Sequence, residues 1–89
     1  MPGGPTNLQS QDLKTVSIYP NPVEDYVWIE NPENKELEFL LYDLYGQLIL
    51  RKSNCTFIDM SNLSEGVYML SIKEINSRNI ETKKIIKMN

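Results

Sequence analysis

Short strand-like runs alternate with turn residues along most of this chain. From Val16 onward, β-branched and other apolar residues form brief runs that are interrupted by Pro, Asn, Asp, Ser and Gly. This spacing is typical of antiparallel strands in a sandwich, and no segment shows a convincing helical pattern. The sequence therefore predicts an all-β fold, an immunoglobulin-like Greek-key β-sandwich of about seven antiparallel strands. The expected strands are 16–19, 26–30, 37–42, 47–52, 57–60, 67–73 and 80–88.

Alternation within these runs indicates which side chains face the core. Successive side chains of a strand point to opposite faces of its sheet. In residues 37–42 we expect Leu37, Phe39 and Leu41 to point inward, and in residues 57–60 we expect Ile58 and Met60 to share one face.

Two local patterns predict defined backbone geometry. Asp43 and Gly46 stand at the first and fourth positions of a type I turn, with Gly46 in the left-handed region, so 37–42 and 47–52 should form a hairpin. Leu63, Gly66 and Tyr68 are spaced as in the tyrosine corner of Greek-key sandwiches, in which a buried phenol bonds to a backbone group a few residues upstream.

Chain length limits the molecule to a single domain with a thin core, because a protein of 89 residues buries only about two-thirds of its unfolded surface. No apolar run approaches the roughly 20 residues that span a bilayer, so we expect no membrane insertion by the chain itself. Residues 1–15 are rich in Gly, Pro, Gln and Ser and are expected to be a flexible linker or a cloning remnant. They do not resemble a secretory signal peptide, which would lie upstream.

Charge is distributed unevenly along the sequence. Residues 1–50 carry eight carboxylates and two lysines, which gives −6, whereas residues 51–89 carry four carboxylates and seven Lys or Arg, which gives +3. A nucleic-acid-binding surface needs clustered basic residues, and only the last strand offers a few. We therefore expect no nucleic-acid partner.

Residues suited to catalysis are few. The chain has no histidine, which is the commonest general base near neutral pH and the commonest metal ligand. The carboxylates at 24–25 and 36–38 flank turns and are expected to be solvated, so we predict no enzyme, no catalytic residues and no cofactor. A calcium site would have to be assembled from separate loops around Glu24, Asp25 and Asp43, and we predict no metal site. The single Cys55 cannot form an internal disulfide and is expected to be a small buried apolar group.

Four aromatic side chains allow a second functional interpretation. Tyr26, Trp28, Tyr42 and Tyr45 could form a sugar-stacking platform, and an immunoglobulin-like adhesion or carbohydrate-binding module is the alternative function. Aromatic residues in a thin β core are more often packed inside, and packing is the favoured interpretation here.

The last segment combines apolar residues with lysines. Ile80, Ile85, Ile86 and Met88 should supply a buried face, while Lys83, Lys84 and Lys87 should keep one side wet. One interpretation is an edge strand protected from aggregation by lysines. The other is a recognition element, because three lysines near the chain end exceed what folding needs.

Four blocks of sequence resemble one family when taken together. They are residues 18–23 with Ile-Tyr-Pro-Asn-Pro-Val, 41–49 with Leu-Tyr-Asp-Leu-Tyr-Gly-Gln-Leu-Ile, 63–70 with Leu-Ser-Glu-Gly-Val-Tyr-Met-Leu, and 83–87 with Lys-Lys-Ile-Ile-Lys. In this order and spacing, residues 16–89 resemble the type A C-terminal sorting domain of the type IX (Por) secretion system of Bacteroidota.

The resemblance implies a transport function. A cargo attached at the N-terminus would reach the periplasm, cross the outer membrane through the translocon, and arrive at the cell surface or outside the cell. A sortase would then remove the domain, which is expected to be a monomer, by cutting near residues 10–16. The matching structural motif residues are Pro20, Asn21, Pro22, Asp43, Gly46, Leu63, Gly66 and Tyr68.

Translocon recognition is expected at the terminal strand. The proposed residues are Lys83, Lys84, Ile85, Ile86 and Lys87, with the strand offering unpaired backbone groups and ammonium donors to a partner by strand addition.

Overall fold

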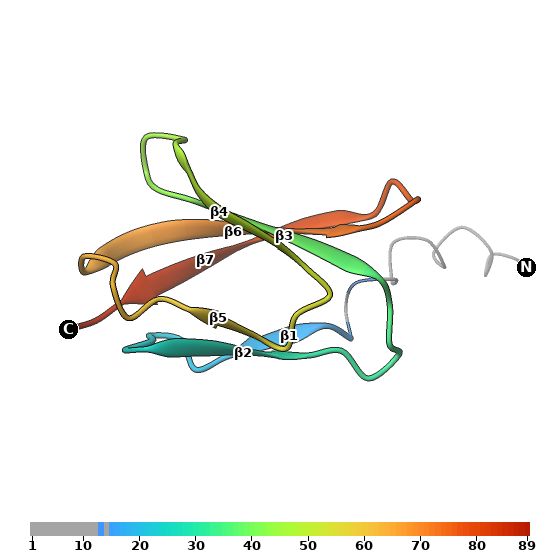
Figure 1. Cartoon of the computed structure of the whole chain (residues 1–89), viewed down its shortest axis with the longest axis horizontal. Coiled ribbons are helices and arrows are strands. Elements are labelled where there is room, and N and C mark those ends of the chain that lie inside the picture. The colour runs from blue at the N-terminus through green and yellow to red at the C-terminus, as the bar shows by residue number, and fades with distance from the viewer. Residues whose placement is uncertain (1–12, 14) are drawn as a thin grey trace, which may run out of the picture.

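The computed structural model describes Leu13 and residues 15–89, and this part of the chain forms seven β-strands without a helix (Figure 1). Each expected strand is present, with ends that differ by one residue or none. The strands are β1 (Ser17–Tyr19), β2 (Tyr26–Glu30), β3 (Leu37–Tyr42), β4 (Leu48–Ser53), β5 (Phe57–Asp59), β6 (Gly66–Glu74) and β7 (Ile80–Lys87).

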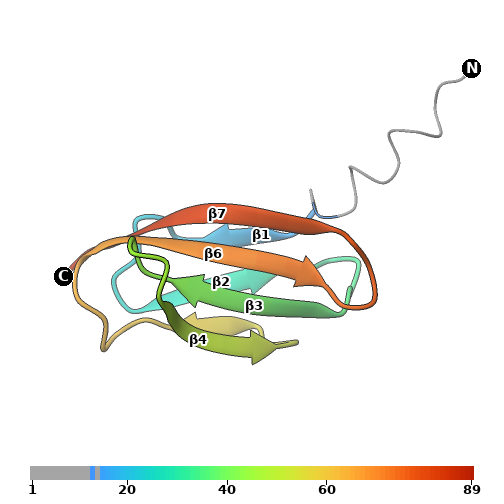
Figure 2. The ribbon, with the colours of Figure 1, turned by 90° about the horizontal axis from the view of Figure 1, so that it is seen from above.

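Two antiparallel sheets face each other across the core, as Figures 1 and 2 show. One sheet has the strand order β1-β2-β5 and the other has the order β4-β3-β6-β7. The chain crosses between the sheets after β2, after β4 and again after β5. The expected immunoglobulin-like sandwich is confirmed, with β4 beside β3 rather than in the sheet of β1 and β2, where the constant-type immunoglobulin domain has its fourth strand.

Alternating side chains fill the space between the sheets. Leu37, Phe39 and Leu41 of β3 are buried as expected. On the other side of the core, Ile58 of β5 and Met60, which follows this strand, are also buried. Full burial of an apolar side chain of this size contributes about 1.5–3 kcal/mol. The other fully buried side chains are Val16, Val23, Val27, Leu70, Ile72 and Ile85.

The hairpin between β3 and β4 has the expected turn. Gly46 has φ +82°, and its N–H donates to the Asp43 carbonyl at 3.1 Å. The Asp43 side chain accepts from the N–H groups of Tyr45 at 2.8 Å and Gln47 at 2.9 Å. Asp43 therefore orders the turn through its carboxylate, while Gly46 supplies a backbone conformation that other residues rarely adopt.

The tyrosine corner is also confirmed. Tyr68 is buried at the start of β6, and its hydroxyl donates to the Ser64 carbonyl at 2.7 Å. Gly66, with φ +149°, leads the chain from this corner into the strand. The bond fixes the path of the connection that crosses from β5 to β6.

Most of the expected linker, residues 1–15, lies outside the described residues. Leu13, however, is buried with the core, and its carbonyl accepts from the Val16 N–H at 3.2 Å. The packed part of the described chain thus includes a residue that precedes Val16.

Candidate functional site at the terminal strand

The terminal strand β7 pairs with β6 along its whole length, from Ile80 opposite Lys73 to Lys87 opposite Gly66. Figure 2 shows it at one margin of the four-stranded sheet. The side chains of β7 therefore alternate between the core and the outer face of this sheet.

This alternation separates the three lysines. Ile85 is fully buried, and Lys87, two residues later on the same face, is only 5% exposed. Lys84 and Ile86 lie on the opposite, outer face and are exposed. The expectation that Lys83, Lys84 and Lys87 keep one side wet is wrong, because Lys83 and Lys87 share the face of Ile85 and only Lys84 points outward with Ile86.

The two inward lysines differ in their surroundings. The Lys87 ammonium donates to the Met88 carbonyl at 2.7 Å, so the buried charge has a polar partner at the end of the strand. The Lys83 ammonium forms an ion pair with Glu81 at 3.4 Å and remains partly exposed. Since Lys87 and Ile85 are buried, this part of the tail is needed for packing, contrary to the expectation that all three lysines exceed what folding needs.

The Asn21 side chain binds the outer edge of β7 as a neighbouring strand would. Its Nδ2 donates to the Lys84 carbonyl at 2.7 Å, and its Oδ1 accepts from the Ile86 N–H at 3.0 Å. The edge is thereby hydrogen-bonded to a residue that lies more than 60 positions earlier in the chain.

Val23 continues this pairing in the parallel direction. Its N–H donates to the Ile86 carbonyl at 2.8 Å, and its carbonyl accepts from the Met88 N–H at 2.7 Å. We call residues 21–23 the clasp. The clasp joins the segment between β1 and β2 to the terminal strand and so connects the two sheets.

The clasp changes how the terminal strand can be recognised. Between Lys84 and Met88, the backbone groups at the outer edge of β7 already have partners. The expected row of unpaired groups is absent there, and strand addition at this stretch would require release of the clasp.

The accessible side of β7 is instead its outer face. Cross-strand register places Lys84 beside Met69 and Ile86 beside Val67, and Tyr42 lies beyond Met69 on β3. These neighbours are partly exposed. We call Leu40, Val67, Met69 and Ile86 the aliphatic face, and Tyr42 and Lys84 lie beside Met69 on this same side of the sheet.

The motif residues gather at the end of the molecule where the chain terminates. Figure 1 shows the β3–β4 turn, the start of β6 and the clasp segment at the same end as the C-terminus. Gly66 is directly opposite Lys87, and Tyr68 is opposite Ile85. The hydrogen bonds described for Asp43 and Gly46 lie within their own turn, residues 43–47, and none reaches β7. The contact between Asn21 and β7 was missed by sequence reasoning, which assigned Asn21 only to a turn.

The four aromatic residues considered as a platform do not come together. Tyr42 lies beside the aliphatic face, and Tyr45 is 94% exposed at the hairpin turn. Tyr26 and Trp28 lie side by side on β2, with ring centroids 6.3 Å apart, and both are exposed. The expectation that they pack in the core is wrong, because the inward positions of β2 belong to Val27 and Ile29.

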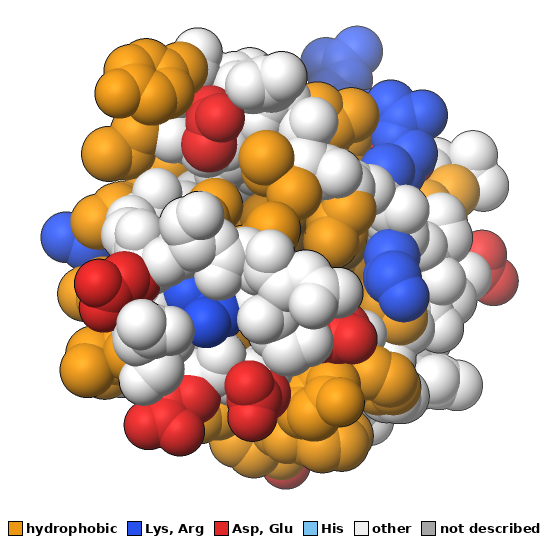
Figure 3. Space-filling view, turned by 60° about the vertical axis from the view of Figure 1, so that its left-hand side comes forward, with side chains coloured by type: hydrophobic (Ala, Val, Ile, Leu, Met, Phe, Trp, Pro, Cys, Tyr) orange, Lys and Arg blue, Asp and Glu red, His pale blue; other side chains and the backbone are white. Residues whose placement is uncertain are grey.

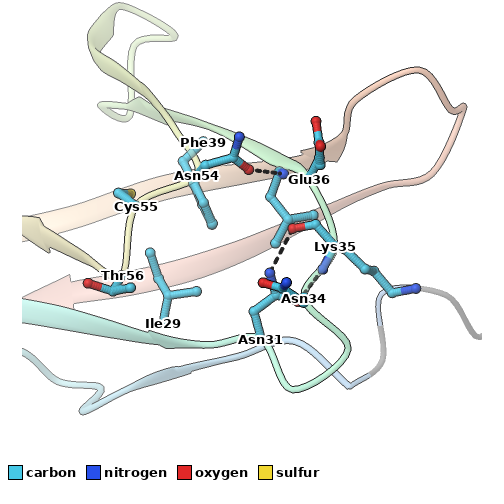
Figure 4. A pocket seen from close by; sticks show the side chains of 10 residues that line it. Ile29, Asn31, Asn34, Lys35, Glu36, Phe39, Asn54, Cys55 and Thr56 are labelled. Atoms are coloured by element: carbon cyan, nitrogen blue, oxygen red, sulfur yellow. Dashed lines mark hydrogen bonds between the residues drawn. The ribbon is translucent and has the colours of Figure 1, made fainter.

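A hollow of about 330 Å³ opens at the other end of the sandwich, between the sheets (Figure 4). Its polar side chains hold the local backbone. Asn54 Oδ1 accepts from the Leu37 N–H at 2.9 Å, and the Asn31 side chain forms two bonds with the backbone of Lys35. Cys55 also lines the hollow, and partial burial raises the pKa of its thiol. The hollow is thus a structural feature of the 31–36 loop.

No group of three or more His, Cys, Asp or Glu that could hold a metal ion occurs in the part of the chain that the structure describes. Hydrogen bonds from the Ser61 hydroxyl and N–H lower the pKa of Asp59.

Among the residues that the structure describes, no helix is long and apolar enough to cross a membrane.

Comparison with known proteins places the whole sandwich in one family. Residues 17–88 match the family model described as "Secretion system C-terminal sorting domain". The chain is 30% identical over 79 residues to a beta-agarase D of Zobellia galactanivorans and 27% identical over 84 residues to the ulvan lyase NLR42 of Nonlabens ulvanivorans. The alignments cover 88% and 90% of this chain but only 16% of each enzyme.

A solved structure has the same fold. It is that of PorZ, a bacterial surface component of the type-IX secretion system of Porphyromonas gingivalis, with a TM-score of 0.71 and 18% sequence identity. The similarity covers 90% of this chain and 12% of that one. Because the family match extends from the first strand to the terminal strand, this chain belongs to the family of secretion system C-terminal sorting domains.

Proposed function

We propose that this domain is a non-catalytic sorting signal that directs an N-terminally attached cargo across the outer membrane through the type IX secretion system. The cargo passes through the periplasm and reaches the cell surface or the surrounding medium. The observation that carries the proposal is the clasp, in which Asn21 of one family motif binds Lys84 and Ile86 of another. The motifs thereby form one folded unit that a partner protein can bind as a whole.

Within this unit, translocon recognition is assigned to residues 83–87, with unequal roles. Lys84 and Ile86 are exposed and can touch a partner directly. Ile85 and Lys87 are buried and support the strand from the core side. Lys83 is partly exposed and forms an ion pair with Glu81. The partner surface is therefore expected to be apolar with carboxylates, matching the aliphatic face and its ammonium group.

The cargo is proposed to be a secreted enzyme. Support comes from the relatives named beta-agarase and ulvan lyase, in which the aligned region is a small part of a much longer chain. A sortase is proposed to release the domain by cutting within residues 10–16. Because Leu13 is buried, the bonds that precede Leu13 are the preferred position for the cut.

The test is a fusion of the whole chain to the C-terminus of a reporter that carries an ordinary signal peptide. In a bacterium with an active type IX system, the reporter is expected outside the cell or on its surface. In a strain without the translocon, it is expected to stay in the periplasm. Periplasmic retention of the fusion in the active strain, with native cargo still exported, would contradict the proposed function.

Lys84→Glu tests the assigned surface within the same fusion. The side chain is exposed, so the free energy of unfolding should change by no more than about 0.5 kcal/mol, as is usual for exposed substitutions. The melting temperature should therefore stay close to that of the wild type. Export is expected to fall severalfold, since the substitution reverses the charge next to Ile86. Arg78→Glu, in the exposed β6–β7 turn, is the matched control and should be exported normally. Equal export of both variants would remove Lys84 from the recognition surface.

A further inference from the structure

We propose that the outer face of the β1-β2-β5 sheet binds a neutral polysaccharide chain through exposed aromatic rings. The residues are Tyr19, Tyr26, Trp28 and Phe57, which we call the aromatic face. This sheet is opposite the one that contains β7, so the proposed binding is independent of the export function.

Register aligns three of the rings across the sheet. Tyr19 is opposite Trp28 on β2, and Trp28 is opposite Phe57 on β5. The rings of Trp28 and Phe57 have centroids 5.4 Å apart, and Tyr26 contacts both, at 6.3 Å and 5.7 Å. Adjacent strands are about 4.8 Å apart, so the three aligned positions span about 10 Å across the sheet.

These rings lie outside the core. They are between 38% and 50% exposed, whereas Val27, Ile29 and Ile58 supply the buried side of the same strands. Exposed positions on a sheet could be Thr at little cost in stability. Four large aromatic side chains on one sheet face, three of them in mutual contact, indicate a binding function.

The composition of the aromatic face favours a sugar over another protein. The outward positions of the three strands contain aromatic and polar residues and no aliphatic one: Ser17, Tyr19, Tyr26, Trp28, Glu30, Phe57 and Asp59. The aliphatic face on the opposite sheet has a mixed surface of Leu, Val, Met and Ile with the single ring of Tyr42 beside them, as expected for a protein partner. Rings with a negative face attract the polarised C–H groups of a sugar ring, and aliphatic groups do not.

The charge of the surroundings selects a neutral ligand. Glu30 and Asp59 share the aromatic face, and Glu24 and Asp25 precede β2. Strands β1, β2 and β5 contain no Lys or Arg. Lys52 of β4 is the cation that adds to the hydrogen bonds of Asp59 in lowering its pKa, so carboxylates outnumber cations around the face. Figure 3 shows acidic and hydrophobic side chains together in the lower part of the molecule, on the side of this sheet. Carboxylates accept hydrogen bonds from sugar hydroxyls and repel sulfated or uronate polymers.

Affinity electrophoresis of the 89-residue chain tests the proposal. Native gels would contain agarose, a neutral soluble β-glucan, or carrageenan as a sulfated galactan. We expect retardation in at least one neutral gel and none caused by carrageenan. Trp28 is the only tryptophan, so the same neutral polymer in solution should change its fluorescence. Absence of retardation in both neutral gels, or stronger retention by carrageenan, would overturn the proposal.

Substitutions identify the surface. Trp28→Ala and Phe57→Ala are each expected to weaken binding about tenfold, as loss of an aromatic contact does. Tyr45→Ala removes a ring that is even more exposed but lies away from the face, and this variant should bind normally. Circular dichroism checks folding, and Tyr19→Ala replaces either variant that fails to fold. Unchanged polysaccharide binding in the aromatic-face variants would overturn the proposal. Loss of self-association in sedimentation, or loss of export, in Trp28→Ala would also overturn it, because either result would assign the face to a protein partner.

Discussion

Gly46 shows how one residue determines a hairpin. Its φ of +82° lies in the left-handed region, and a Cβ atom built there would meet nothing within 4 Å. The requirement for glycine therefore comes from the backbone conformation and not from crowding. Gly46→Val should destabilise the domain by about 1–2 kcal/mol.

Thermal unfolding measures this effect, since 1 kcal/mol shifts the melting temperature of a domain of this size by about 4–8 °C. Gly46→Asn is the matched control, because asparagine tolerates left-handed φ, and it should lose much less. Equal melting temperatures for wild type and Gly46→Val would contradict the turn assignment.

Sequence reasoning at the residue scale succeeded where the signal is local. The turn hydrogen bonds of Asp43 and Gly46 and the hydroxyl bond of Tyr68 reach residues at most four positions away, so the local sequence determines their geometry. It failed for Lys87. Two consecutive isoleucines, Ile85 and Ile86, leave both alternation phases open, and only the packing of β7 on the core decides which isoleucine is buried.

At the scale of elements, the clasp is the contact that holds β7 in place. Asn21→Ala removes two hydrogen bonds and leaves the Lys84 carbonyl and the Ile86 N–H to water. Each such bond contributes about 0.5–1.5 kcal/mol, so we expect a loss of about 1–3 kcal/mol in the free energy of unfolding.

Chemical denaturation gives this value, and hydrogen exchange at the Ile86 amide should accelerate in the variant. Asn62→Ala, at an exposed turn, is the control and should change stability by no more than about 0.5 kcal/mol. Protection of the Ile86 amide that is as strong in Asn21→Ala as in wild type would show that the side chain does not hold the strand.

Strand positions were the most predictable part of the fold. The expected ranges 26–30 and 37–42 match β2 and β3 in full, because turn residues border these runs on both sides. The clasp could not be predicted, since no local pattern links Asn21 to Lys84. The exposure of Trp28 could not be predicted either, because β2 alternates aromatic with aliphatic residues and either set could have faced the core.

For the whole molecule, β7 and the clasp together close the sandwich. Removal of residues 84–89 would take Ile85 and Lys87 out of the core and leave Val23 without its partners. The truncated chain is expected to lose its cooperative unfolding transition, as measured by circular dichroism during heating. Removal of Asn89 alone, which lies beyond the strand, should leave the transition intact. A folded protein lacking residues 84–89 would show that the tail serves recognition alone.

The junction between Val23 and Ile86 also has a consequence for the speed of folding. The two residues are more than sixty positions apart in the sequence, so their hydrogen bond closes a long loop of chain. Contacts of such high sequence separation slow folding, because the entropy of loop closure is lost before the contact contributes. The parallel junction is therefore expected to form late, after the hairpin of β3 and β4.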